Sequence, residues 1–162
     1  MNVVETRDDE TAAASPAASR RSGRSPGRAL ALQYLYSWDQ NHYLDEGRLV
    51  PDDLLAEAAD DATAFARTLF AGCLAQRIPV DAAVDARLEK WTIQRLAVVD
   101  RAILRLGAYE IIYCPETPPK VAINEGIELA KLYGSEAKTA KLVNGVLDRI
   151  AREHRPNEVG KR

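Results

Sequence analysis

The sequence has few of the residues that catalysis and metal binding use most. Only two cysteines and two histidines, His42 and His154, occur among 162 residues. No Cys-x-x-Cys pair, His-Glu-x-x-His pattern or glycine-rich phosphate loop is present. The isolated thiols of Cys73 and Cys114 suit neither a disulfide framework nor a metal site and indicate a reducing compartment. We therefore expect a protein that is not an enzyme, with no catalytic residue, metal site or cofactor.

Long apolar runs are also missing. No stretch of 18 apolar residues occurs, which argues against a membrane-spanning helix. The N-terminus begins with acidic residues and lacks the apolar region of a secretory signal peptide. These features predict a cytoplasmic protein that makes no use of a membrane.

Charge is nearly balanced over the whole chain but is unevenly distributed. The formal net charge is -2, and the segment 39–61 carries eight acidic residues against Arg48 alone. Basic residues gather elsewhere, and four arginines lie within nine positions: Arg20, Arg21, Arg24 and Arg28. A second basic group lies near the C-terminus: Lys141, Arg149, Arg152, Arg155, Lys161 and Arg162. If the first and last helices packed side by side, the two groups would form one surface.

Apolar periodicity predicts helices and no sheet. The first 24 residues show no such pattern and predict a disordered tail, acidic and then rich in arginine. Ser25 and Pro26 have the residue types of an N-cap and a first helical position, and the helix that they would open ends near Asn41. Tyr34 and Tyr36 fall on opposite sides of this helix, so we expect one in the core and the other exposed.

The rest of the chain shows the same 3.6-residue spacing. Start signals and apolar stripes predict further helical segments from Pro51, over 65–77, over 80–88, as a turn over 92–96, over 99–113, from Pro119 to a left-handed Gly134, and from Thr139 to about 155. The prediction is an all-α, compact bundle of six or seven helices over residues 25–156. A short basic tail, residues 157–162, follows.

The four N-terminal arginines suggest contact with phosphate. Guanidinium groups bind phosphate through a planar fork, and several together release counterions from a nucleic-acid backbone. A solvated, solubilising arm explains the same residues, because runs of charge often have no other role. Composition alone leaves both interpretations open.

Four motifs, in order along about 130 residues, resemble the transcription antitermination factor family NusB. They are Arg28–Trp38 (RALALQYLYSW), Val99–Glu110 (VDRAILRLGAYE), Lys120–Lys131 (KVAINEGIELAK) and Leu142–Ala151 (LVNGVLDRIA). The resemblance implies an all-helical RNA-binding protein. It also implies a pairing with NusE, a protein of the small ribosomal subunit, to recognise boxA in nascent ribosomal RNA within the RNA polymerase antitermination complex.

The resemblance also implies roles for individual residues. The arginine-rich arm and the start of the last helix correspond to the RNA face of the family; the residues are Arg20, Arg21, Arg24, Arg28, Lys141 and Leu142. Leu142 stands where the family usually has an aromatic residue. Tyr36, Asp100 and Arg101 correspond to positions at or beside the NusE contact. We expect Asp100 on an exposed helix face, where charge complementarity would set the register of the partner.

Two alternatives stay open beside an RNA-binding factor. NusB-like domains also occur ahead of an RNA methyltransferase, but this chain has no glycine-rich strand–loop motif and no residues left over for a methyl-donor domain, so we expect no such activity unless it is a fragment. The other alternative is a helical interaction scaffold or homodimer acting in ribosomal RNA maturation. The oligomeric state is left open as monomer or homodimer.

Overall fold

The computed structural model describes residues 16–41 and 60–160, with side chains of the first segment described from Arg24 onward. Within these ranges the chain forms six α-helices and one short 3-10 helix, and no strand. The elements are α1 (Pro16–Gln40), α3 (Asp61–Ala75), α4 (Arg77–Asp85), η1 (Ile93–Arg95), α5 (Val98–Tyr113), α6 (Pro119–Tyr133) and α7 (Thr139–His154). The all-α prediction is therefore confirmed, whereas the predicted helix from Pro51 lies largely outside the described residues.

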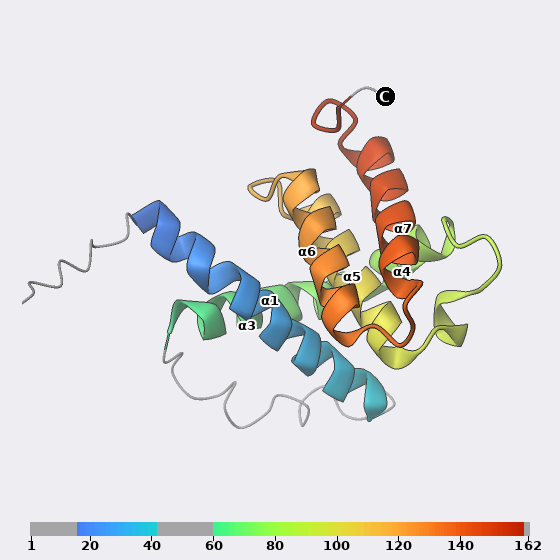
Figure 1. Ribbon diagram of the computed structural model, residues 1–162, viewed down its shortest axis with the longest axis horizontal. Coiled ribbons are helices and arrows are strands. Elements are labelled where there is room, and N and C mark those ends of the chain that lie inside the picture. The colour runs from blue at the N-terminus through green and yellow to red at the C-terminus, as the bar shows by residue number, and fades with distance from the viewer. Residues whose placement is uncertain (1–15, 42–59, 161–162) are drawn as a thin grey trace, which may run out of the picture.

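Helix α5 is the centre of the bundle. It contacts α1, α3, α4, α6 and α7, and its residues from Ala102 to Ala108 are all buried. Helices α6 and α7 pack on each other beside α5, while α1 and α3 lie together across the other side of the bundle (Figure 1). Helices α1 and α7 do not form a packed pair, so the two basic groups do not merge in the way that the sequence suggested.

Helix α1 begins earlier than predicted. It runs from Pro16 through Pro26 without a break, so the helix covers residues 16–24, while residues 1–15 of the predicted tail lie outside the described residues. The predicted cap at Ser25 is therefore wrong, and the Ser25 hydroxyl instead donates a hydrogen bond to Glu125 Oε1 at 2.8 Å. A proline inside a helix removes one backbone hydrogen bond, and α1 nevertheless continues through this position to Gln40.

Prolines and glycines determine several of the other boundaries. Pro79 lies in the first turn of α4, where its missing N–H is no loss, so α3 and α4 are separate helices as predicted. Thr92 precedes η1 at the predicted position, but its side chain makes no capping hydrogen bond. Pro119 opens α6 as predicted, and α7 ends at His154, close to the predicted end at about residue 155.

Gly134 ends α6, but not in the left-handed conformation that we predicted. Its φ and ψ are -56° and 149°, which any residue can adopt. A Cβ atom on Gly134 would lie 2.4 Å from the carbonyl oxygen of Ala130 and 2.9 Å from Cβ of Thr139. Close approach of the chain, and not a positive φ, therefore requires glycine here.

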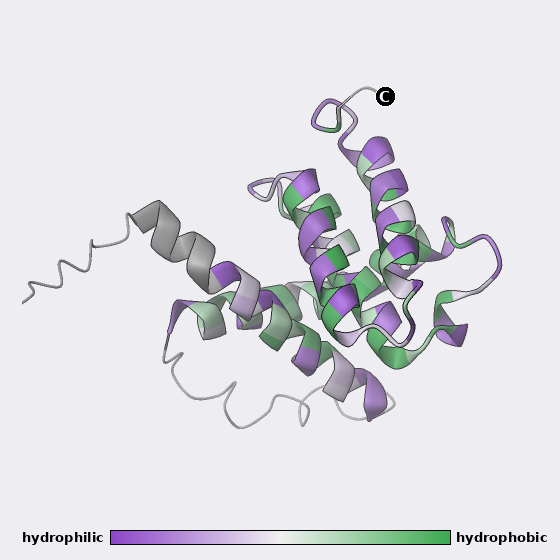
Figure 2. Cartoon of the chain, viewed as in Figure 1, coloured by the Kyte–Doolittle hydropathy of each residue, from purple (hydrophilic) through white to green (hydrophobic). Residues whose placement is uncertain are grey.

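The core joins all the helices. Hydrophobic residues gather where α1, α3 and α5 meet, and hydrophilic ones mark the outer sides of α6 and α7 (Figure 2). Tyr34 is buried and Tyr36 is exposed, as the spacing predicted. Cys73 and Cys114 are both free thiols in buried positions, so they act as small hydrophobic residues.

Candidate nucleic-acid interface

The two described arginines of the N-terminal cluster have different environments. Arg24 is partly exposed, with its guanidinium 5.8 Å from the centre of the Phe65 ring. Arg28 is 2% exposed and donates two hydrogen bonds of 2.8 Å to the carboxylate of Glu110, while Glu125 lies 3.9 Å from it. Burial by itself would lower the pKa of Arg28, but its hydrogen bond and charge pairing with Glu110 raise the pKa overall.

The structure therefore does not place Arg28 on an exposed RNA face, where we had predicted it. Its guanidinium lies between α1 and α5, with both carboxylate oxygens of Glu110 as partners, and no surface is left for a phosphate. Arg20 and Arg21 lie on the helical backbone of α1, but their side chains are outside the described residues. Of the four arginines, only Arg24 has a described side chain with a surface that a strand can reach.

Lys141 and Leu142 are in the first turn of α7. Lys141 is exposed, and Leu142 is half-buried against the core. Both line a cleft of about 620 Å³ formed by the segment between α4 and α5, the start of α5, the loop before α7 and one side of α7. The structure thus joins these two predicted residues to a surface concavity.

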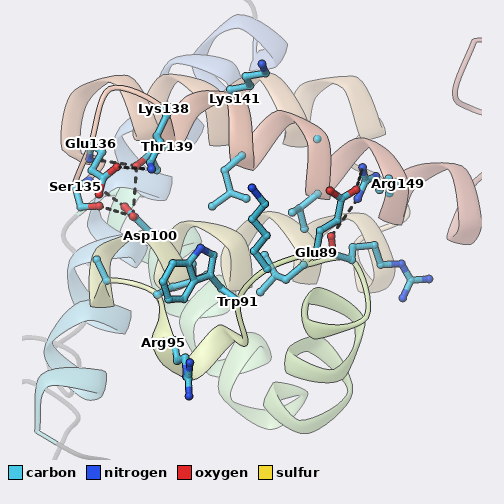
Figure 3. A pocket seen from close by; sticks show the side chains of 18 residues that line it. Glu89, Trp91, Arg95, Asp100, Ser135, Glu136, Lys138, Thr139, Lys141 and Arg149 are labelled. Atoms are coloured by element: carbon cyan, nitrogen blue, oxygen red, sulfur yellow. Dashed lines mark hydrogen bonds and ion pairs between the residues drawn. The ribbon is translucent and has the colours of Figure 1, made fainter.

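The centre of this cleft carries an exposed aromatic ring. Trp91 lies across from α7, between a hydrogen-bond network at Asp100 and an ion pair of Glu89 with Arg149, whose N–O distance is 2.8 Å (Figure 3). Arg95 and Lys141 occupy opposite sides of the cleft in the same view (Figure 3). We call the lining residues taken together the α7 cleft.

Asp100 is buried, contrary to the expectation of an exposed helix face. Its carboxylate accepts hydrogen bonds from the backbone N–H of Ser135 at 2.9 Å, the Ser135 hydroxyl at 2.5 Å and the Thr139 hydroxyl at 3.3 Å. These bonds satisfy polar groups of the loop before α7. Asp100 is 6% exposed and holds the start of α7 against α5, so it has little surface for a partner.

Arg101 is also engaged within the fold. It donates to both carboxylate oxygens of Asp39, at 2.5 and 2.6 Å. Arg105 donates to the same Asp39 at 2.9 Å and to Asp81 at 2.8 and 2.9 Å. This network joins α1, α4 and α5. Of the three predicted partner contacts, only Tyr36 has a largely exposed side chain, at 40%, with its hydroxyl accepting a hydrogen bond from Gln40.

Sequence reasoning missed Trp91 and Arg95. A signal was present, because a tryptophan that belongs to no apolar stripe lies between Lys90 and Arg95. Its exposed fraction of 57% is the feature that makes it a candidate, and the sequence does not give that quantity.

The described thiols are unsuited to nucleophilic chemistry. Burial raises the pKa of Cys73 to about 12 and that of Cys114 to about 11, so both stay protonated near neutral pH. Burial also raises the pKa of Tyr109, beside Cys114, to about 12. Across residues 16–41 and 60–160, no three metal-ligating side chains come together and no helix is long and apolar enough to cross a membrane.

The fold and the α7 cleft define an all-helical protein with a basic, aromatic-bearing groove on its surface. The sequence profile of the NusB family matches residues 25–152. This chain belongs to the NusB family.

Individual relatives agree with this assignment. A transcription antitermination protein NusB from Geobacillus kaustophilus is 39% identical over 129 residues, which are 78% of this chain and 94% of the relative. Another from Heliobacterium modesticaldum is 38% identical over 138 residues, and the chain spans 64% of its length. Both relatives align with most of this chain.

Solved structures are similar in fold. NusB of Thermotoga maritima has a TM-score of 0.72 and 36% identity, and the match covers 86% of this chain and 94% of that one. A crystal structure of antitermination factors NusB and NusE in complex with double-stranded RNA has a chain that matches with a TM-score of 0.68 and 30% identity. That match covers 82% of this chain and 98% of the other.

Proposed function

We propose that this protein is an RNA-binding transcription antitermination factor. With NusE it recognises boxA-type sequences in nascent ribosomal RNA and modulates termination by RNA polymerase in the bacterial cytoplasm. The observation that carries the proposal is the match over residues 25–152 to a family whose relatives are antitermination proteins. A structural neighbour in complex with NusE and RNA supports the choice of partners. The role is one of binding and not of catalysis.

The RNA face that we propose consists of two parts. Arg20, Arg21 and Arg24 on α1 supply positive charge to the strand, and Lys141 and Leu142 contact it from the start of α7. Phosphate contacts of this kind give affinity and orientation, while splayed bases on the protein surface give sequence preference. Arg28 supports this face only indirectly, because it fixes α1 against Glu110.

The surface that we propose for NusE includes Tyr36. Its ring is exposed on α1 while its neighbours on the same helix, Leu35 and Trp38, are buried. Exposed aromatic residues are frequent anchors of protein interfaces. Asp100 and Arg101 contribute by holding α5 in shape and not by direct contact, since their charged groups are occupied inside the bundle.

A titration of the full chain with RNA tests this function. A fluorescently labelled boxA RNA and a scrambled strand of equal length are titrated with the protein alone and with an equimolar mixture of the protein and NusE. We expect tighter binding to boxA than to the scrambled strand, and a further gain when NusE is present. Equal affinity for the two strands under both conditions would reject the proposal.

One observation favours a second candidate, a homodimer or interaction scaffold in ribosomal RNA maturation. Leu132 and Tyr133 lie next to each other at the end of α6 with exposed fractions of 70% and 50%. Exposed apolar side chains that form a contiguous patch mark protein–protein contacts. Sedimentation at several protein concentrations tests it, since a concentration-dependent dimer supports this candidate and a monomer throughout rejects the homodimer.

A further inference from the structure

Trp91 is unusual because the segment that carries it is firmly held while its ring is not covered. Ile93, two residues later, is 1% exposed, and its backbone N–H donates to Asp85 Oδ1 at 2.6 Å. The ring of Trp91 nevertheless leaves 57% of the residue accessible in the α7 cleft. A large aromatic surface held open on an anchored segment is a stacking platform that is ready before any ligand arrives.

The charges of the cleft are not balanced. Its lining has three acidic residues, and each has a partner: Glu89 pairs with Arg149, Glu136 with Lys138, and Asp100 accepts three hydrogen bonds. Three basic side chains of the same lining, among the described residues, have no hydrogen bond or ion pair: Lys90, Arg95 and Lys141. The cleft thus keeps uncompensated positive charge although the chain has a net charge of -2.

We propose that a single-stranded segment of RNA crosses the α7 cleft and stacks one base on Trp91, with Arg95 and Lys141 holding its phosphates on the two sides. The proposal rests on the RNA-binding function proposed above and adds a base-contacting residue to it. A base must be unpaired to lie flat on a side chain, so the occupant is a single strand and not a duplex.

Charge decides between RNA and a protein as the occupant. An apolar protein segment on Trp91 would cover Arg95 and Lys141 without giving them partners, and desolvated unpaired charges are costly. A strand of RNA offers a flat ring to Trp91 and a phosphate to each cation, so it satisfies the apolar and the charged groups together. An acidic protein segment is the competing occupant, and the test below includes it.

The experiment uses the full chain with NusE and a boxA single strand of about twelve nucleotides. Trp91→Ala should weaken binding by about 5- to 150-fold, the range that loss of one stacked base gives. Trp91→Phe, which keeps a ring, should retain most of the affinity. Tyr113→Ala is the matched control, because Tyr113 is an exposed aromatic residue at the end of α5 that lies away from the cleft. This variant should bind RNA as the parent protein does.

Tryptophan fluorescence gives a second readout. The chain has only two tryptophans, and Trp38 is buried while Trp91 is exposed. RNA should quench emission of the parent protein, and Trp91→Phe should lose the quenching while it still binds. This combination separates a base on the ring from a general change in stability.

Salt dependence tests the phosphate contacts. Arg95→Gln should reduce the slope of log affinity against log salt by about 0.7, the value for one contact to a single strand. Lys120→Gln is the charge-matched control, since Lys120 is exposed at the start of α6 and outside the cleft. Its slope should equal that of the parent protein.

Three results would overturn the inference in different ways. One result is that the parent protein binds boxA, Trp91→Ala binds it equally well, and RNA still quenches the tryptophan emission of that variant. In that case the cleft is not the RNA site, although the RNA-binding function stands. If Trp91→Ala loses NusE affinity and keeps RNA affinity measured without NusE, the occupant is a protein. If the parent protein binds no RNA with or without NusE, the proposed function fails and this inference fails with it.

Discussion

Arg28 and Glu110 form a buried ion pair between residues that are 82 positions apart in the sequence. Both side chains are 2% exposed, and two parallel hydrogen bonds of 2.8 Å join them. The geometry is the planar, two-bond fit that arginine and carboxylate make best. The pair ties α1 to the central helix, which gives Arg28 a role in the fold.

Removing Arg28 should therefore destabilise the protein. Arg28→Ala leaves the Glu110 carboxylate buried without its partner, and breaking a buried pair in this way costs about 3–5 kcal/mol. Urea denaturation followed by circular dichroism measures the change. Arg24→Ala is the matched control on the same helix, and its loss should stay below about 1 kcal/mol because, among the described residues, Arg24 makes only a ring contact with Phe65.

The different environments of Arg24 and Arg28 also decide which variant can test RNA binding. A double change of Arg24 and Arg28 to alanine would mix a loss of folding with a loss of charge, so Arg24→Ala alone is the informative variant. It should weaken boxA binding and lower the salt dependence. Unaltered affinity and salt slope in this variant would remove Arg24 from the RNA face.

Replacing Asp100 should lower the stability of the protein, because its carboxylate is bound inside the fold. Asp100→Ala leaves the N–H and hydroxyl of Ser135 without their acceptor, and each lost hydrogen bond to a charged group is worth about 1.5–3 kcal/mol. Ser135→Ala should reproduce part of the loss in urea denaturation. Glu136→Gln, an exposed neighbour paired only with Lys138, should change stability little. A fully stable Asp100→Ala variant that fails to bind NusE would restore the partner role.

Gly134 allows a test that separates two reasons for a glycine. A Cβ atom at this position meets the carbonyl oxygen of Ala130 at 2.4 Å, so Gly134→Ala should cost about 1–3 kcal/mol. Gly134→Asn should cost at least as much. A left-handed residue would instead tolerate asparagine better than alanine.

The control for this change is Gly145→Ala in α7. A Cβ atom there has no neighbour within 4 Å, so alanine should stabilise the helix by about 0.5–1 kcal/mol. Thermal unfolding midpoints of Gly134→Ala, Gly134→Asn and Gly145→Ala measure these changes in stability. Asparagine less damaging than alanine at Gly134 would contradict the observed backbone.

The raised pKa of Cys73 predicts a loss of stability in alkali. Burial raises the pKa from 9.0 to about 12, so above pH 9 the unfolded chain releases a proton that the folded chain keeps. The contribution of the protonated Cys73 thiol to the free energy of unfolding is complete below pH 9 and is lost as the pH rises toward 12. At pH 10 the free energy of unfolding should be lower by about 1.4 kcal/mol. Urea midpoints at pH 8 and pH 10 measure it, and Cys73→Ala should show a smaller decrease between the two.

Tyr36 should matter to NusE and not to folding. Its ring is exposed, so Tyr36→Ala should leave the urea midpoint within about 0.5 kcal/mol of the parent. If the ring anchors NusE, the same change should weaken that complex about tenfold or more in a calorimetric titration. Gln33→Ala, also exposed on α1, is the matched control. Equal affinities of the two variants would place the NusE contact elsewhere.

The helices from α5 to α7 were predictable because their boundaries depend on local signals. Pro119 and the apolar stripes of Val99–Tyr113 and Val143–Ile150 give spacing and limits that no tertiary contact has to override. The start of α1 was not predictable in the same way. Pro26 suits a first helical turn equally well, and the residue types around it do not distinguish that position from the interior place that it has in α1.

The site was harder to predict because charge type does not reveal burial. Arg24 and Arg28 have the same chemistry in the sequence, yet Arg28 follows the spacing of Leu32, Leu35 and Asp39 and shares their buried face. That periodicity was a usable signal. The exposure of Trp91 and the burial of Asp100 depend on how a loop and a helix start meet across the bundle, which a single sequence does not encode locally.

The charged pairs along α1 have one more consequence. Arg28 is held by Glu110 near the end of α5, and Asp39 is held by Arg101 and Arg105 in the first half of that helix. Sliding α1 along α5 by a single turn would separate Arg28 from Glu110 and Asp39 from Arg101, so these pairs fix the register of the two helices. The same pairs therefore set how far the part of α1 before Arg28 extends beyond α5.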